Sequence, residues 1–335
     1  MPHSQDAAAL TPQPLQEMQF AMAATRVLTS AVQLHVFTHI AGGRRTVAAV
    51  AAAEQADPRG LRMLLDAAVG LGLLRKSGPE YALAPLSARY LVAGEPDYLG
   101  YAIETEHLWQ SWSHLTEAVR NGRPYRAVNR QPVAESFFPG LVRSLHVQNR
   151  QPAERLALAL RPRAGSRVLD VGCGSGVWSL ALARADRSLR VCALDFAPVL
   201  ELTREYAQAA QAAAQYEFRA GNLRSTELGC EQYDLALLAN IVHSEDEATL
   251  DQLFSRIRQA LRPGGRIVIV DMLPNDERSG PVFPLLFALN MLVNTEQGGV
   301  YTLQEYRTWL QAAGFTAIDT VEIGSHSPAI VAQRN

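Results

Sequence analysis

Four residues at alternating positions, Asp170, Gly172, Gly174 and Gly176, form the pattern with the clearest chemical meaning in this chain. They follow an apolar run and precede a helix-like stretch at residues 178–184. Glycines at the exit of a buried strand let the backbone turn sharply and approach a ligand, and the amides of the next helix face that ligand. The pattern therefore predicts a strand, a tight turn and a helix that bind a nucleotide-like molecule.

The spacing of these glycines argues against a dinucleotide. The G-x-G-x-x-G fingerprint needs a third glycine where this chain has Val177. Asp170 would repel a pyrophosphate and suits a cationic, amino-acid-like group. A second carboxylate, Asp195, ends the next predicted strand and could accept both ribose hydroxyls of an adenosine. The alternative interpretation is a glycine turn in a sheet that binds no ligand.

With these residues the C-terminal half resembles the class I methyltransferases that use S-adenosylmethionine. Their Gly-Asp-Leu signature, in which the acid contacts adenine, is Gly221-Asn222-Leu223 here. An amide can still donate to a ring nitrogen or accept from the exocyclic amine. Asn240, at the end of a later strand, is expected to contact the cofactor as well. The resemblance implies that the cofactor is held by Asp170, Gly172, Gly174, Gly176, Asp195, Asn222, Leu223 and Asn240.

Nearly the whole chain is similar to the plant-type and bacterial small-molecule O-methyltransferases. In that family a strand like residues 233–243 runs into a histidine that acts as general base, which implies this role for His243, with Asp271 as the acid that orients it. The family's second acid should follow Gly298-Gly299, where this chain has none, and Glu296 is a nearby substitute. A solvated loop histidine is the alternative interpretation of His243.

The acceptor site follows from the same resemblance. The family roofs its substrate with a helix like residues 283–295, where Phe287, Met291 and Asn294 recur at helical spacing. Methionine adapts to flat apolar ligands and asparagine can fix one polar group, whereas core packing is the alternative for Phe287. A helix before the glycine turn carries His146 and Asn149, where the family has a substrate-facing residue. His146 could hydrogen-bond a polar acceptor or lie at the surface.

The elements that must position these residues belong to an α/β fold. Short apolar runs alternate with helical patterns from residue 167 onward, which predicts a Rossmann-like, doubly wound methyltransferase sheet. The resemblance implies seven strands. We expect residues 151–335 to form the S-adenosylmethionine-binding catalytic domain. Residues 1–150 are expected to form a mostly helical, winged-helix-like domain for dimerisation and for a substrate lid.

The N-terminal half combines two predicted helices, at residues 46–56 and 58–71, with a predicted hairpin at residues 73–83. This order is typical of winged-helix DNA-binding domains. Arg59 and Arg62 could reach phosphates, but Asp66 lies among them and the net charge of the chain is −2, so nucleic-acid binding is not expected. In the resembling family this domain serves dimerisation, and we expect a homodimer.

Apolar residues recur at helical spacing over residues 15–40 and predict one or two helices there. Their apolar stripe faces either the partner subunit or the core of the same chain, and the two interpretations have equal support from the sequence. The stripe comprises Phe20, Met22, Val27, Leu28, Val32 and Val36.

Length and composition limit the remaining possibilities. A chain of 335 residues favours about two domains, and 48% hydrophobic with 19% charged residues is ordinary for a globular protein. No apolar run approaches the length of a membrane helix and no signal pattern opens the sequence, so a cytoplasmic protein without a membrane partner is expected. The three cysteines are scattered, which predicts neither a disulfide framework nor a metal site.

The sequence thus predicts an S-adenosylmethionine-dependent O-methyltransferase of secondary metabolism that acts on a hydroxyl of a small aromatic or polyketide-like molecule and releases S-adenosylhomocysteine. Two alternatives remain open. The same fold could methylate nitrogen or carbon, or use the bound cofactor for hydroxylation or rearrangement without methyl transfer. A non-catalytic binding or regulatory protein is the second alternative.

Overall fold

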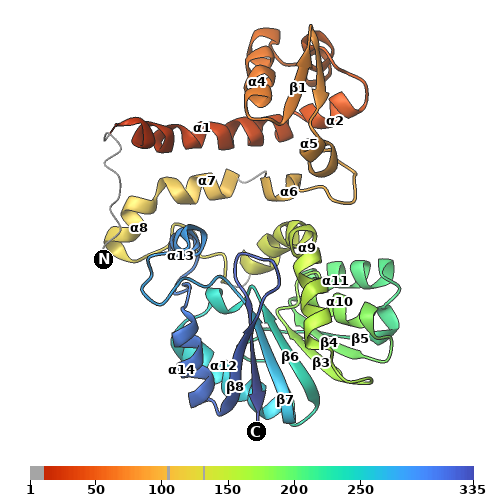
Figure 1. The fold of residues 1–335 in the computed structure, drawn as a ribbon, viewed down its shortest axis with the longest axis vertical. Helices are drawn as coiled ribbons and strands as arrows, with labels where there is room; N and C mark the ends of the chain where they lie inside the picture. The colour runs from red at the N-terminus through yellow and green to blue at the C-terminus, as the bar shows by residue number, and fades with distance from the viewer. Residues whose placement is uncertain (1–10, 104–105, 131–132) are drawn as a thin grey trace, which may run out of the picture. The chain divides into compact units, whose positions relative to one another are not determined.

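The computed structural model describes residues 11–103, 106–130 and 133–335 (Figure 1). The chain forms two compact units, Met1–Thr105 and Glu106–Asn335. Residue 150, where the sequence predicts a domain boundary, lies inside the long helix α9 (Val133–Leu160), and the whole of α9 belongs to the second unit. The roles predicted for the two parts, dimerisation and substrate lid for the first and catalysis for the second, stay predictions.

The first unit is mostly helical and has its own hydrophobic core. Its long apolar stretch forms two helices, α1 (Gln13–Gln33) and α2 (Val36–Ala41), which are separated at His35 by a left-handed φ of 45°. Val32 and Val36 are buried in the core of this unit, whereas 72% of Phe20 is exposed. The two interpretations of the stripe therefore apply to different halves of it: its end packs inward and its start is open to a partner.

The predicted helix, helix and hairpin pattern is confirmed. Helices α3 (Val47–Glu54) and α4 (Pro58–Gly70) are followed by β1 (Leu74–Ser77) and β2 (Glu80–Leu83), which pair antiparallel. Asp66 on α4 pairs with Arg62 and Lys76 and accepts a hydrogen bond from Tyr81. Asp66 thus pairs with one cation on α4 and with one on β1. Two short helices complete the unit, α5 (Pro85–Tyr90) and α6 (Gly100–Ile103).

The second unit is built on a seven-stranded sheet with the order β5-β4-β3-β6-β7-β9-β8, in which β9 runs antiparallel to both of its neighbours. The chain order reverses between β3 and β6, so this pair forms the switch point of a doubly wound sheet. The strands are β3 (Arg167–Val171), β4 (Arg190–Asp195), β5 (Tyr216–Ala220), β6 (Tyr233–Ala239), β7 (Leu261–Val270), β8 (Phe315–Val321) and β9 (Ala329–Arg334).

Helices cover both faces of this sheet (Figure 1). Alternation along β3 sends Leu169 and Val171 to the face covered by α12 (Glu247–Ala260) and α14 (Leu303–Ala312). Val168 points to the other face, which is covered by α9 and α10 (Val177–Ala185). The loops after β3, β4, β6 and β7 consequently meet at one edge of the sheet. The helices of this unit besides α9 are α7 (Glu106–Ser113), α8 (Leu115–Asn121), α10 (Val177–Ala185), α11 (Ala197–Ala209), α12 (Glu247–Ala260), α13 (Val282–Asn294) and α14 (Leu303–Ala312).

The predicted seven-stranded, doubly wound sheet is confirmed, and the helices predicted at residues 178–184 and 283–295 form with ends that differ by one residue. The start of the last helix, α14, was predictable because Thr302 and Glu305 form a reciprocal capping box there. Within the ranges that the structure describes, no helix is long and apolar enough to cross a membrane.

Candidate active site

The predicted glycine turn joins β3 to α10. Gly172 has a left-handed φ of 65°, and its N–H donates to the carbonyl of Leu194 at 2.8 Å. A Cβ at Gly172 would stand 3.0 Å from Ile241. Gly174 and Gly176 also have positive φ, and Thr203 Oγ1 donates to the Gly174 carbonyl at 2.7 Å. The turn is thus held from β4, from the loop after β6 and from α11, and glycine is required by conformation and by space.

Asp195 lies at the end of β4, directly beside this turn. Its two carboxylate oxygens accept the N–H groups of Gly174 at 2.8 Å and of Phe196 at 2.7 Å. Burial raises the pKa of Asp195 to about 6, although these two hydrogen bonds act in the opposite direction. A carboxylate has about four acceptor positions, so two remain for the hydroxyls of a ribose.

Asp170 lies below the turn and is only 2% exposed. It accepts a hydrogen bond from Ser179 Oγ at 2.5 Å, and Ser179 is in turn 2.9 Å from the hydroxyl of Tyr216. Burial raises the pKa of Asp170 to about 7, opposed by the Ser179 hydrogen bond and assisted by the negative charge of Asp195. Two carboxyl groups in a buried setting create a negative potential, which favours a cationic ligand.

The three other predicted cofactor residues follow strand ends at the same edge. The Oδ1 atom of Asn222 accepts the N–H of Arg224 at 2.9 Å, so its Nδ2 is the group left to donate to a ring nitrogen. Leu223 packs on the core below the sheet. Asn240 follows β6 with a left-handed φ of 57°, and its N–H donates to the Val270 carbonyl at 2.7 Å.

His243 and Asp271 are in direct contact and both are buried. Asp271 Oδ1 lies 2.6 Å from His243 Nδ1, and Asp271 Oδ2 accepts the backbone N–H of His243 at 2.9 Å. Tyr306 of α14 donates to the same Oδ2 at 3.4 Å. Because a carboxylate only accepts, Nδ1 of His243 carries the proton and Nε2 has a free lone pair. The pair is therefore arranged so that Nε2 can accept a proton.

Glu296 does not take part in this arrangement. It is exposed and forms an ion pair with Arg130. The segment after it supports His243 through the backbone instead, since the N–H of Gly299 donates to the His243 carbonyl at 2.9 Å. The carboxylate that holds the histidine is that of Asp271.

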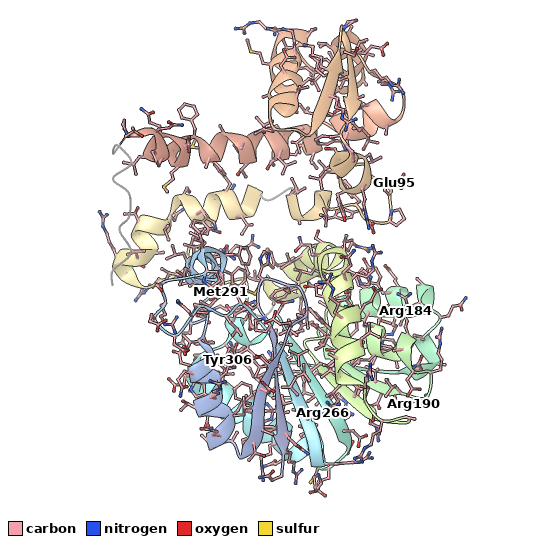
Figure 2. All side chains as sticks on the ribbon, in the orientation of Figure 1. Glu95, Arg184, Arg190, Arg266, Met291 and Tyr306 are labelled. Atoms are coloured by element: carbon pink, nitrogen blue, oxygen red, sulfur yellow. The ribbon has the colours of Figure 1, made fainter. Side chains whose placement is uncertain are left out.

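The residues predicted to line the acceptor site on α13 lie on one face of this helix. The ring of Phe287 meets that of His243 edge to face, with 4.9 Å between the centroids. Met291 and Asn294 are buried, at 6% and 4% exposed. Met291 on α13 is labelled in Figure 2, as is Tyr306 on α14. The amide nitrogen of Asn294 donates to the Oδ1 of Asn290, whereas the Oδ1 atom of Asn294 has no hydrogen-bond partner in the described ranges. Buried polar atoms are normally hydrogen-bonded, and a donor group on a bound ligand would satisfy this oxygen.

His146 and Asn149 lie on α9. His146 Nδ1 lies 2.9 Å from Ser175 Oγ in the glycine turn, and its ring stacks on Tyr206 of α11 with 3.8 Å between centroids. Burial, and to a lesser extent Arg150, lowers the pKa of His146 to about 4, so the ring is neutral at physiological pH. Asn149 donates to the Leu145 carbonyl of its own helix. Only His146 contacts the glycine turn, and the predicted contact of both residues with an acceptor stays a prediction.

Sequence reasoning missed three of the partners: Ser179, Tyr216 and Tyr306. Ser179 and Tyr306 each reach a predicted carboxylate from another element, and Tyr216 reaches Ser179. All three stand at positions that also suit an ordinary packed helix or strand. The serine could have been found, because position 179 lies three residues after the last glycine, where an α10 side chain turns back toward the strand. The two tyrosines carry no such local signal.

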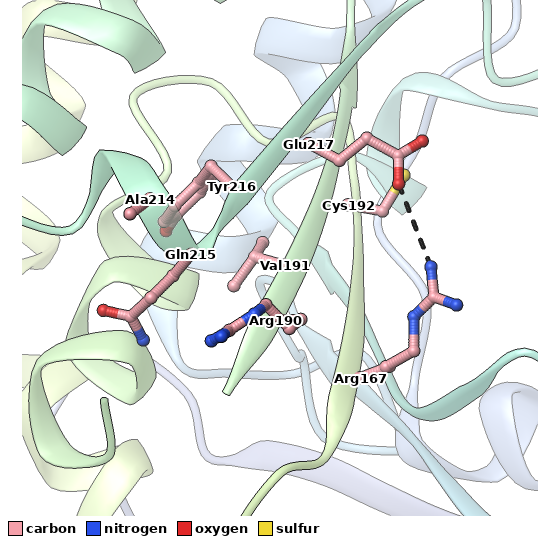
Figure 3. A pocket seen from close by; sticks show the side chains of 8 residues that line it. All are labelled: Arg167, Arg190, Val191, Cys192, Ala214, Gln215, Tyr216 and Glu217. Carbon is pink, nitrogen blue, oxygen red and sulfur yellow. Dashed lines mark ion pairs between the residues drawn. The ribbon is translucent and has the colours of Figure 1, made fainter. Parts of the chain in front are cut away.

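A small cavity of about 200 Å³ lies at the opposite end of β4 and β5 (Figure 3). Its walls include Arg190, Gln215 and the ion pair of Arg167 with Glu217. None of the predicted site residues lines it. No group of three or more histidine, cysteine, aspartate or glutamate side chains in the described ranges is placed to hold a metal ion.

Comparison with known proteins identifies the family. The model of the O-methyltransferase domain matches residues 112–316, and that of the O-methyltransferase dimerisation domain matches residues 16–93. The chain belongs to the O-methyltransferase family. This O-methyltransferase is 30% identical to the tetracenomycin polyketide synthesis 8-O-methyl transferase TcmO of Streptomyces glaucescens, with 92% of each chain covered. It is 31% identical to the 3-hydroxy-5-methyl-1-naphthoate 3-O-methyltransferase of Streptomyces sahachiroi, covering 90% of this chain and 88% of the relative.

The structure of human N-acetylserotonin methyltransferase in complex with S-adenosylmethionine is also similar, with a TM-score of 0.85, 27% identity and full coverage of both chains. The O-methyltransferase described here uses the same cofactor. Its residues suit this molecule. Asp195 is a half-buried carboxylate bonded only by backbone N–H groups, which matches a neutral diol, and the buried Asp170 matches a positive charge. The glycine spacing, which argues against a dinucleotide, is consistent with this family.

Proposed function

We propose that this enzyme methylates a hydroxyl group of a planar aromatic or polyketide-like metabolite and that His243 is its general base. The observation that carries the proposal is the double contact of Asp271 with the ring and the backbone of His243. This contact fixes both the tautomer and the direction of the imidazole. The names of the two Streptomyces relatives support the class of acceptor, since one is an O-methyl transferase of polyketide synthesis and the other a 3-O-methyltransferase of a hydroxynaphthoate.

When bound, S-adenosylmethionine supplies an electrophilic methyl group. The protein must remove the proton of the acceptor hydroxyl, because a phenol with a pKa near 10 is a poor nucleophile at neutral pH. In the proposal His243 Nε2 accepts this proton, and Asp271 stabilises the resulting imidazolium from the Nδ1 side. Phe287 keeps water from the ring and presents an apolar surface to the acceptor. The unpartnered Oδ1 of Asn294 accepts a hydrogen bond from a second polar group of the acceptor.

We further propose that the enzyme is a cytoplasmic homodimer. The match to a dimerisation domain and the exposed start of α1 support the dimer: Leu15, Met18 and Phe20 are each more than 70% exposed. Exposed apolar side chains of this size on one helix are unusual on a monomer and are typical of a surface that a partner covers.

A screen tests the reaction. Phenols, hydroxynaphthoates, polyketides, amines and enols are incubated with the enzyme and S-adenosylmethionine, and both S-adenosylhomocysteine and product mass are measured. O-methyl products from the hydroxylated aromatics are the expected result. Methylation of nitrogen or carbon only, or a product altered without an added methyl group, would contradict the proposed reaction.

A further inference from the structure

The ring of the proposed general base is one end of a series of aromatic contacts that reaches the protein surface. His243 meets Phe287, Phe287 stacks on Phe283 with centroids 6.0 Å apart, and Phe283 stacks on His326 with centroids 4.1 Å apart. The last pair is nearly parallel, with 18° between the ring planes. Phe283 is 41% exposed and His326 is exposed, so the series leads from a buried catalytic group to solvent.

The position of Phe283 on α13 continues the face predicted to line the acceptor site. Phe283 precedes Phe287 by four residues, and side chains four apart lie above one another on a helix. The next residues on this face are Met291 and Asn294. The acceptor-lining face therefore extends one helical turn beyond the residues found from sequence, to the surface at the start of α13.

His326 comes from a different part of the chain, the loop between β8 and β9. The neighbouring Ser327 is buried and its Oγ accepts the N–H of Leu273 at 2.8 Å. Leu273 follows Asp271 by two residues, and the intervening N–H of Met272 donates to Asp271 Oδ1 at 2.8 Å. The segment that holds the general base therefore also fixes the loop that carries His326.

Contacts therefore connect His243 with His326 by two routes, one through Asp271 and Ser327 and one along α13 through Phe287 and Phe283. We propose that His326 and Phe283 form the outer contact of the acceptor site and favour acceptors with two or three fused aromatic rings. The inference rests on the proposed function, because it assumes that His243 faces the reacting hydroxyl.

The length of the acceptor decides whether it contacts His326. A one-ring phenol whose hydroxyl lies at His243 ends beside Phe287, whereas a three-ring acceptor extends along Phe283 to the imidazole. One aromatic contact contributes a factor of about 2 to 12 in affinity. His326 should therefore affect the affinity and the KM of long acceptors only, with kcat unchanged, because it is remote from the transferred proton.

The test compares 2-hydroxyanthraquinone, with three fused rings, and methyl 4-hydroxybenzoate, with one. Calorimetry measures the Kd of each for the full-length protein loaded with S-adenosylhomocysteine. We expect His326→Ala to weaken binding of the three-ring probe about 2- to 12-fold and to leave the one-ring probe unchanged. His326→Phe, which keeps an aromatic face without the ring nitrogens, should restore the wild-type value.

His114→Ala is the matched control, because His114 forms a similar stack on the exposed Tyr125, at 4.0 Å and 21°, away from the contacts between His243 and His326. It should change neither Kd. Equal affinity of wild type and His326→Ala for the three-ring probe overturns the inference, as does an equal loss for both probes or a wild type that binds only the one-ring probe. Methyl transfer by the wild type is scored separately, so a failure of the proposed reaction is distinguished from a failure of this contact.

Discussion

Replacement of Asp271 by asparagine tests the proposed base most directly, since it replaces one carboxylate oxygen by an NH₂ group and changes the volume very little. Asp271 accepts from His243 Nδ1 and Met272 N–H with Oδ1, and from His243 N–H and Tyr306 with Oδ2. An asparagine must place its amide nitrogen at one of these two positions. At the Oδ1 position it donates to Nδ1 and moves the ring proton to Nε2, where it blocks proton acceptance. At the Oδ2 position it faces the backbone N–H of His243.

Both arrangements have a cost that can be estimated. The wrong tautomer removes general-base catalysis, which is worth about 10²- to 10⁴-fold in rate. A buried N–H that loses its acceptor destabilises the fold by about 1–3 kcal/mol. We therefore expect Asp271→Asn to lower kcat by about 10²-fold or more and to lower the melting temperature modestly. The affinity for S-adenosylmethionine should change little, because neither oxygen of Asp271 belongs to the predicted cofactor contacts.

The assay is S-adenosylhomocysteine formation under saturating cofactor with an acceptor that the wild type methylates, alongside calorimetry for cofactor binding. Asp234→Asn is the control, because Asp234 also accepts a backbone N–H, from Arg167 at 2.7 Å, but at the opposite edge of the sheet. His243→Ala should lose a similar factor, and the double variant should lose no more than the larger single loss, since both act on one proton. Wild-type turnover in Asp271→Asn, or losses that multiply in the double variant, would refute the reasoning.

Three further predictions follow from the other groups of the structure. Asp195→Ala should weaken S-adenosylmethionine binding at least tenfold by calorimetry, because two hydrogen bonds to a charged acceptor are lost, and Asn222→Ala should weaken it less; equal losses would contradict the ribose role of Asp195. The buried Asp170, with a folded pKa of about 7 against about 3.9 when unfolded, holds its proton in the folded state between these values, so the stability of the cofactor-free protein should fall as pH rises from about 4 to 7. The gain in melting temperature of Asp170→Asn over wild type should accordingly be larger at pH 8 than at pH 5. A gain independent of pH would mean that the pKa of this carboxyl is not raised in the folded protein. Phe20→Glu should shift the protein from dimer to monomer in light scattering, whereas Leu158→Glu, at a leucine of similar exposure on α9, should not; a monomeric wild type at micromolar concentration would remove the dimer.

The order of elements was predictable because each carries its own local signal. The glycines of the turn are recognisable from spacing alone, since glycine adopts the left-handed φ values of 56° to 71° found there without the steric cost of a Cβ. Buried parallel strands are continuous apolar runs, and helix starts such as Asp57-Pro58 carry their capping residues in the sequence. The pairing of His243 with Asp271 was accessible only through the resemblance to a family, because twenty-eight residues separate them.

Tertiary structure decided the contacts between elements that are distant in the chain. His146 was expected at the acceptor and lies against Ser175 and Tyr206, because the direction of a side chain on α9 depends on how that helix packs, which helical periodicity leaves open. His326 lies in a loop without any motif, and its stack on Phe283 of α13 and the hydrogen bond from the Leu273 N–H to Ser327 Oγ join segments that are distant in the chain. Residue type and local spacing thus determined the strands, the turn and the acids at their ends, whereas packing across the sheet edge decided which side chains meet, because those contacts depend on the relative placement of whole elements.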